Sequence, residues 1–230
     1  MTAQHPVRGD VAVLVRAAGL GTRLGGGTPK ALRILAGESL LSHAVRRVAA
    51  APSVGYVVVA APPEDPGAVG PLPGPVTVVP GGATRQASVA AALAAVPDEY
   101  QIILIHDAAR ALAPTRLVEA VAAAVRAGWD AVIPVLPVVD TIKEVTASDT
   151  VVGTVDRSVL RVVQTPQGFR RAVLAAAHAA ATDDHTDDAG MVEKLGVRVH
   201  IVPGDEAAFK ITRPVDLVLA EVLLAGTLLS

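Results

Sequence analysis

Short runs of β-branched residues alternate along this chain with segments of helical periodicity. The β-branched runs predict five strands, at residues 11–15, 56–60, 76–79, 102–105 and 131–135. Apolar spacings of three and four residues predict helices at residues 39–51, 84–95, 114–127, 171–182, 189–195 and 214–224. Because strands and helices in alternation are joined by right-handed crossovers, we expect a doubly wound, mostly parallel, Rossmann-like α/β sheet. Ligands of such sheets bind at the carboxyl ends of the strands.

Residues 137–164 break this alternation. Two β-like runs, 141–145 and 151–155, flank a turn at 147–150, and this pattern predicts a hairpin that projects from the sheet. We therefore expect a single domain over residues 1–230 with an arm at about 137–164. An isolated hairpin is only marginally stable in water, so its apolar residues need a partner surface. A second copy of the arm in a twofold dimer would supply that surface; the alternative is an arm folded back on its own domain.

The composition argues against several classes of function. The formal net charge is −2, whereas a nucleic-acid or anionic membrane partner requires a basic excess. There is no cysteine, which rules out disulfides, thiol catalysis and thiolate metal sites. Aromatic residues make up 2% of the chain, so backbone groups and small side chains must read any bound base. The first ten residues lack the apolar core of a signal peptide, and we expect a cytoplasmic protein.

A glycine-rich segment, AAGLGTRL at 17–24, follows the first predicted strand. It lacks the third glycine of the dinucleotide fingerprint, because Leu24 holds that position, and this disfavours a dehydrogenase. It is not a P-loop either, since Lys30 follows Pro29 rather than glycine. A loop of this kind can bring backbone N–H groups, Arg23 and Lys30 to phosphates. The alternative is a surface turn with two solvated cations.

Ionisable residues follow the fourth predicted strand as HDAAR at 106–110. Asp107 could bind a hydroxyl, a ribose or a hydrated Mg²⁺. Arg110 could hold a phosphate or could simply pair with Asp107. His106 could act as a general base, but the chemistry set out below favours a positioning or partly buried structural histidine.

Two further segments carry polar residues whose roles stay open. In DDHTDD at 183–188, Thr186 or Asp187 could cap the next helix, or Thr186 could bind a substrate phosphate or hydroxyl. Lys210 lies in the strand-like stretch FKIT. Such a lysine is usually an edge residue with its amine in solvent, although it can equally point into an anionic site.

Together these segments resemble one family, the 2-C-methyl-D-erythritol 4-phosphate cytidylyltransferases of the non-mevalonate isoprenoid pathway. The resemblance runs in order from about residue 11 to about residue 221, over AAGLGTRL…PKAL, GGATRQASV, HDAAR, PVVDTIKEV, TVDRSVL, QTPQGF, TDDAG and FKITRPVDL. It implies a nucleotidyltransferase that joins CMP from CTP to a polyol phosphate, giving the CDP-methylerythritol product and pyrophosphate. It also implies a homodimer with interlocking arms.

The resemblance implies roles for individual residues. Arg23 and Lys30 are expected to stabilise charge at the reacting phosphate. Arg157 and Lys210 are expected to position the acceptor phosphate, with Arg157 serving the neighbouring chain's site. Acceptor-side contacts are expected from Asp107, Arg110, Thr141 and Thr186. Contacts to CTP are expected from Ala17, Ala18, Gly19, Gly82, Ser88 and Ala108.

Four positions depart from the family pattern. Arg16 stands where proline is usual, Ala31 where glutamine is usual, and Gly190 where serine is usual. Ala83 stands where an aspartate that helps to read cytosine is often found. Backbone groups and a nearby hydroxyl could still discriminate the base, and Arg16 adds a cation beside the nucleotide loop.

The expected chemistry needs no general base. A phosphate monoester has a second pKa of about 6, so at neutral pH it is already largely an anionic nucleophile. The difficulty is electrostatic, and positioned cations with Mg²⁺ held mainly by the triphosphate would meet it; no protein metal site is expected. Two alternatives stay open: a cytidylyltransferase for another alditol phosphate such as ribitol 5-phosphate, and a non-catalytic nucleotide-binding regulator.

Overall fold

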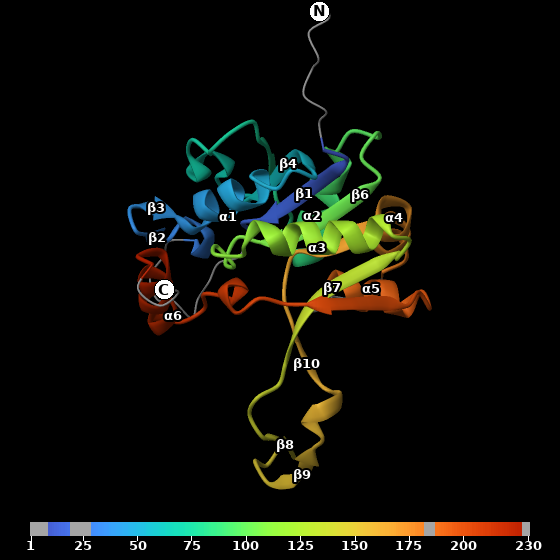
Figure 1. Cartoon of the computed structure of the whole chain (residues 1–230). Helices are drawn as coiled ribbons and strands as arrows, with labels where there is room; N and C mark the ends of the chain where they lie inside the picture. Colours follow the sequence, from blue (N-terminus) through green and yellow to red (C-terminus); the bar gives the residue numbers. More distant parts are fainter. Residues whose placement is uncertain (1–8, 19–28, 182–186, 227–230) are drawn as a thin grey trace, which may run out of the picture.

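The computed structural model describes residues 9–18, 29–181 and 187–226. An eight-stranded sheet forms its centre, in the order β10-β7-β11-β6-β1-β4-β5, with β12 also paired to β7 (Figure 1). The strands are β1 (Val11–Arg16), β4 (Val54–Ala61), β5 (Thr77–Pro80), β6 (Ile102–Asp107), β7 (Ala131–Pro137), β10 (Arg161–Val163), β11 (Gln167–Arg170) and β12 (Val199–Pro203). Only β10 and β11 pair antiparallel with their neighbours, which confirms the predicted mostly parallel α/β class.

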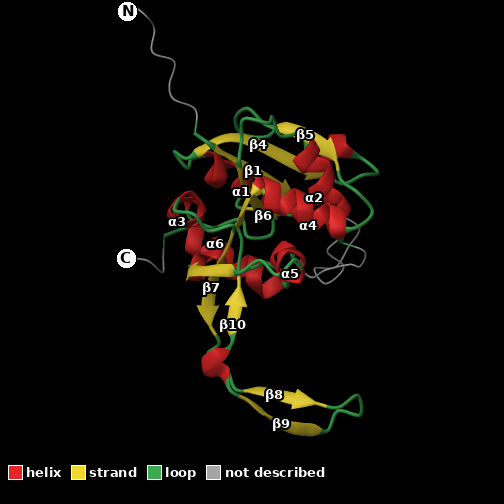
Figure 2. Cartoon of the chain, turned by 90° about the vertical axis from the view of Figure 1, so that its right-hand side faces the viewer, coloured by secondary structure: helices red, strands yellow, loops and turns green. Residues whose placement is uncertain are grey.

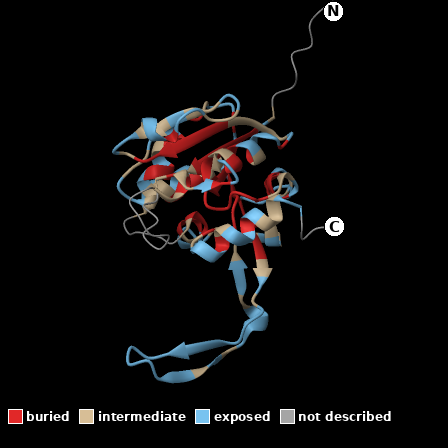
Figure 3. Ribbon diagram, turned by 90° about the vertical axis from the view of Figure 1, so that its left-hand side faces the viewer, coloured by how far each residue is buried: buried red, intermediate tan, exposed pale blue. Residues whose placement is uncertain are grey.

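Helices cover both faces of this sheet (Figure 1). They are α1 (Leu40–Ala49), α2 (Arg85–Ala94), α3 (Thr115–Arg126), α4 (Arg171–Ala180), α5 (Asp188–Lys194) and α6 (Pro214–Leu224). Side chains alternate between the faces of a strand, so β1 contributes to two cores. Val13 packs in one core with residues of α1 and α3, whereas Leu14 packs in the other with residues of α2, α4 and α5. Burial is accordingly concentrated in the central strands and the helix faces that cover them (Figure 3).

A hairpin leaves the body after β7. Its strands β8 (Ile142–Val145) and β9 (Val151–Val155) pair antiparallel, and the short helix η4 (Arg157–Val159) and β10 lead the chain back to the sheet. Figures 1 and 2 show the hairpin projecting away from the sheet and its helices. The predicted projecting hairpin is therefore confirmed.

Three details of the strands differ from the prediction. β6 extends to Asp107, so His106 and Asp107 lie inside the strand and not after it. Residues 209–212 form no strand: Ile211 N donates to Ala109 O (2.9 Å), but Phe209 N donates back to Glu206 O (3.2 Å) and Thr212 N donates to Asp216 Oδ2 (2.7 Å). β10, β11 and β12 were not predicted; β11 inserts between β6 and β7.

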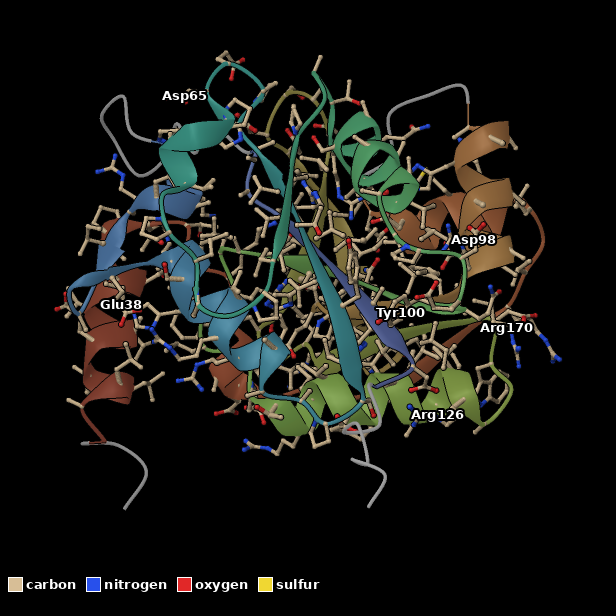
Figure 4. All side chains as sticks on the ribbon, turned by 90° about the horizontal axis from the view of Figure 1, so that it is seen from above. Glu38, Asp65, Asp98, Tyr100, Arg126 and Arg170 are labelled. Atoms are coloured by element: carbon tan, nitrogen blue, oxygen red, sulfur yellow. The ribbon has the colours of Figure 1, made fainter. Side chains whose placement is uncertain are left out.

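The outer surface of the body is charged. Seen from above, Glu38, Arg126 and Arg170 lie at its periphery (Figure 4). Arg126 pairs there with Asp10 (2.6 Å), just before the amino end of β1.

Among the described residues, no helix combines the length and the apolar character that a membrane span requires.

Candidate active site

The centre of the sheet contains a topological switch point. β1 pairs with β4 on one side and with β6 on the other, and all three strands run parallel. From β1 the chain first builds outward through β4 and β5, and then returns to place β6 on the opposite side. Ligands of open α/β sheets bind outside the carboxyl ends of the strands at such a point. The last residues of β1 and β6, Arg16 and Asp107, are register partners there.

Asp107 lies between two cations. Arg16 Nη1 donates to Oδ1 at 2.7 Å, and Lys210 Nζ lies 2.8 Å from Oδ2. Burial acts to raise the pKa of Asp107, but Arg16, Lys210 and Arg110 together lower it well below its ordinary range. The carboxylate is therefore ionised at every pH at which the protein would work. The sequence left open a pair between Arg110 and Asp107, but among the described residues the ion pairs of Asp107 are with Arg16 and Lys210.

A cavity of about 510 Å³ opens beside this carboxylate. Its lining mixes cations, carboxylates, amides and a hydroxyl: Arg16, Arg85, Arg110, Lys210, Asp107, Asp187, Glu193, Gln164, Gln167 and Thr165, with Ile133, Val163 and Ala189. Several of these residues come from segments far apart in the sequence. Such a lining suits a small polar ligand that both donates and accepts hydrogen bonds.

His106 is fully buried on the other side of β6. Its Nδ1 lies 3.1 Å from Oγ1 of Thr165, which also accepts a hydrogen bond from Asp107 N (3.0 Å). Burial lowers the pKa of His106 to about 4, against the opposing effect of Asp107. The imidazole is thus neutral at physiological pH, and it does not line the cavity. The preference for a structural histidine over a general base fits this position, although the burial is complete and not partial.

Arg110 is held by main-chain groups. Its Nη1 donates to Ala208 O at 2.7 Å and its Nη2 donates to Val163 O at 3.0 Å. Burial lowers the pKa of this guanidinium and Asp107 raises it. Arg110 therefore fastens the segment before Lys210 to the segment before Thr165, while it adds positive potential to the cavity wall.

Arg85 reaches the cavity from the first turn of α2. It pairs with Asp188, whose other oxygen lies 3.1 Å from Nε2 of His178. Asp188 is fully buried, and although burial acts to raise its pKa, His178 and Arg85 lower it. Sequence reasoning did not identify Arg85 as a site residue. One sequence feature could have identified it: Arg85 directly follows Thr84, the N-cap of the helix that comes after β5.

Of the expected nucleotide contacts, those among the described residues lie just after β1, β5 and β6 and in the first turn of α2. Ala17 N donates to Ala60 O (2.9 Å), and Ala108 N donates to Arg16 O (3.2 Å). Ser88 Oγ accepts a hydrogen bond from Gly82 N at 3.1 Å. A side chain at Gly82 would put its Cβ 2.3 Å from Cβ of Ala87, so only glycine allows this close approach of loop and helix.

Ala18 closes the same corner of the structure. A Cβ added to Gly81 would lie 2.9 Å from Cβ of Ala18 and 3.1 Å from Ser88 Oγ, so these groups converge on one small space. The space is lined by backbone and small side chains.

The remaining expected site residues fall into three groups. Arg157 and Thr141 are exposed on the arm, where Arg157 donates to Val139 O; neither lines the cavity of its own chain. Lys30 is half-buried in the short helix η2 (Lys30–Leu32). Arg23, Gly19 and Thr186 lie outside the described residues. Asp187 caps α5, accepting from Gly190 N at 3.0 Å.

Comparison with known proteins identifies the family of this chain. A sequence model of the 2-C-methyl-D-erythritol 4-phosphate cytidylyltransferase family matches residues 11–226. Proteins of that name from Frankia casuarinae and Streptomyces coelicolor are 57% and 53% identical, over 94% and 93% of this chain and 81% and 84% of theirs. The crystal structure of the Thermus thermophilus enzyme of that name is 39% identical, with a TM-score of 0.75 over 92% of this chain and 98% of that one.

Proposed function

The chain belongs to the 2-C-methyl-D-erythritol 4-phosphate cytidylyltransferase family, and on that premise we infer that it transfers CMP from CTP to 2-C-methyl-D-erythritol 4-phosphate and releases pyrophosphate. It is a CTP-dependent nucleotidyltransferase of the non-mevalonate isoprenoid pathway. One observation carries this conclusion: the family match covers residues 11–226 without a break. We also propose that the reaction takes place in the cytoplasm, where CTP is available.

The cavity beside Asp107 is the proposed acceptor site. Lys210, whose Nζ lies 2.8 Å from Asp107 Oδ2, is proposed to bind the acceptor phosphate, and Asp107 is proposed to accept hydrogen bonds from acceptor hydroxyls. Arg110 adds positive potential, and Thr186 is proposed as a further contact to the acceptor. The attacking phosphate oxygen is already ionised at neutral pH, so no side chain has to remove a proton. The neutral, buried His106 agrees with this scheme.

The nucleotide is proposed to bind across the ends of β1, β4 and β5. Gly82, Ser88, Ala17, Ala18, Gly19 and Ala108 are its proposed contacts. Gly82 and Ser88 offer backbone and hydroxyl groups to the pyrimidine edge, and their mutual hydrogen bond shows that these groups lie together. Arg23 and Lys30 are proposed to stabilise the charge that develops on the α-phosphoryl oxygens.

The side chains of the described residues are compatible with a metal ion that is bound through the nucleotide. Both oxygens of Asp107 contact cations, which disfavours a divalent ion on that carboxylate. Within residues 9–18, 29–181 and 187–226 there is no group of three or more metal-ligating side chains. We propose that Mg²⁺ is held mainly by triphosphate oxygens and water, as this ion prefers, where it would neutralise phosphate charge.

The arm is proposed to complete the site of a second chain. Thr141 directly precedes β8 and Arg157 begins η4, and neither lines the cavity of its own chain. The hairpin itself projects away from the body (Figure 2). Their expected roles at the acceptor phosphate therefore require either a large movement of the arm or a partner chain. We propose a homodimer in which the arms at about residues 137–164 interlock.

The reaction is tested with purified chain, Mg²⁺, each of the four nucleoside triphosphates and a panel of polyol phosphates, with pyrophosphate release as the readout. We expect release with CTP and 2-C-methyl-D-erythritol 4-phosphate. Faster turnover of ribitol 5-phosphate would contradict the acceptor assignment. Binding of CTP with no turnover of any acceptor would instead support a regulatory protein.

A further inference from the structure

Arg16 lines the cavity, but the proposed reaction assigns it no role. It ends β1, and its side chain remains 19% exposed while lining the cavity. Within the described residues, the only side-chain hydrogen bond of its guanidinium runs from Nη1 to Asp107 Oδ1. Arg16 Nε is buried and has no hydrogen-bond partner among the described residues, so the guanidinium keeps a donor that a ligand in the cavity could use.

The surroundings of Arg16 disfavour a purely structural role. Burial lowers the pKa of its guanidinium, Asp107 raises it, and nearby Arg85 lowers it again. Arg16 and Arg85 are both half-buried, and each pairs with one carboxylate, Asp107 and Asp188 respectively, so two cations line the same cavity. The hydrogen bonds of the sheet already hold the end of β1 to the end of β6, and a buried ion pair is not by itself a source of stability.

The cavity around Arg16 is suited to hydroxyl groups. Asp107, Asp187 and Glu193 place carboxylates in its wall, and Gln164 and Gln167 add amides. Carboxylates repel a phosphate, whereas each hydroxyl of a polyol can donate to a carboxylate and accept from a cation. A carboxylate beside a guanidinium thus offers both halves of the hydrogen bonding that a hydroxyl needs.

We propose that Arg16 is a specificity-determining residue for the acceptor: it holds Oδ1 of Asp107 while Lys210 holds Oδ2, and a remaining N–H group of its guanidinium donates to a hydroxyl oxygen of the polyol. This inference rests on the proposed function. It assigns the phosphate end of the acceptor to Lys210 and the polyol end to the pair formed by Arg16 and Asp107. The contribution of Arg16 appears in acceptor binding and not in the binding of CTP.

The test compares Arg16→Met with Arg16→Lys in steady-state assays. Arg16→Met should raise the KM for the acceptor roughly tenfold to a hundredfold, the usual range for loss of a charged hydrogen bond, with little change in the KM for CTP. Arg16→Lys should recover part of this loss because it keeps one cationic donor. Acceptor analogues that each lack one hydroxyl identify the group that Arg16 contacts. The analogue without that hydroxyl should bind wild-type protein weakly, and its affinity should not fall further in Arg16→Met.

Arg126→Met is the matched control. It breaks another arginine–aspartate pair, that with Asp10, at the amino end of β1 and at the periphery of the molecule (Figure 4). The control should leave both KM values unchanged. If Arg16→Met lowers the melting temperature with an unchanged acceptor KM, or raises the two KM values equally, the proposal is overturned.

The wild-type assay separates this proposal from the proposed function. If wild-type protein turns over no acceptor, the proposed reaction is wrong, and calorimetric binding of 2-C-methyl-D-erythritol 4-phosphate then decides the question. Weaker binding to Arg16→Met than to wild-type protein would still support the role of Arg16. Equal binding, or no binding to either protein, would overturn it.

Discussion

His106 and Asp107 are neighbours in the chain with opposite environments. Successive side chains of a strand point to opposite faces, so once β6 extends to Asp107 one of the two must face the core. His106 takes the core position and Asp107 lines the cavity. The sequence predicted a strand that ends before both residues, so it could not show which of them would be buried. The decisive contact, Arg16 to Asp107, depends on the register of two strands that lie 91 positions apart in sequence.

A first prediction concerns the pH dependence of stability. The pKa of His106 falls from 6.5 in the unfolded chain to about 4 in the fold, so the unfolded chain binds the proton first as pH falls. Stability is therefore complete above pH 6.5 and is lost progressively between 6.5 and about 4, by roughly 1 kcal/mol per pH unit. Denaturant unfolding of wild-type protein should show this slope.

His106→Asn is the comparison for this slope. Asparagine can keep a hydrogen bond to Thr165 but has no proton to gain, so its unfolding free energy should be flat between pH 6.5 and about 4. Carboxylates with lowered pKa values, such as Asp107 and Asp188, lose their stabilising contribution only below that window. An equal slope in both proteins would mean that another group titrates.

A second residue-scale prediction concerns Lys30. If Lys30 stabilises charge on the reacting phosphate, its effect is confined to the transition state. Lys30→Ala should then lower kcat by about a hundredfold to a thousandfold, as for loss of one preorganised charge-stabilising group, while the KM for CTP changes less. Lys30→Arg should retain part of the activity. Full turnover by Lys30→Ala in a pyrophosphate-release assay would remove this residue from the site.

Elements with strong local signals were predicted well. α6 was predicted at its observed bounds, Pro214–Leu224, because proline begins it and an apolar pattern runs through it. β11 was missed because its sequence, Gln167–Arg170, has no β-branched residue, and its pairing between β6 and β7 is a property of the sheet. The 3-10 helix η3 (Pro66–Val69) is short because it lies in a segment dense in proline and glycine, which disfavours a long helix.

The N-terminus of α2 provides a prediction at this scale. Thr84 Oγ1 accepts a hydrogen bond from Ala87 N at 3.1 Å and so caps the helix that carries Arg85 and Ser88. Thr84→Ala should lower the free energy of unfolding by about 1 kcal/mol, and Thr84→Ser should keep most of it. Chemical denaturation measures both values. Equal losses in the two variants would show that packing of the threonine methyl group, and not the cap, is responsible.

At the scale of the whole molecule, the contacts within a single chain do not explain the arm. Val139, Val145, Val151, Val152 and Val159 are all more than half exposed in this part of the structure, and the arm has little contact with the body (Figure 3). An exposed apolar surface of this kind marks a site of protein interaction. A twofold dimer would bury the same patch on both chains and bring each Arg157 toward the other chain.

The last prediction is therefore that each active site is shared between two chains. Arg157→Ala and Lys30→Ala chains, each nearly inactive alone, should regain activity when they are mixed and allowed to exchange. A mixed dimer contains one site in which both cations are intact, so an equal mixture should reach about a quarter of wild-type activity, since half of the dimers are mixed and each has one of two sites restored.

The rival arrangement gives a different result in the same mixture. If Arg157 acts on the site of its own chain, both sites of a mixed dimer stay defective and activity does not return. Differently tagged chains, captured through one tag and detected through the other, show whether mixed dimers have formed. Mixed dimers without recovered activity would place Arg157 in its own chain's site, and a monomer by light scattering would remove the dimer on which the shared site depends.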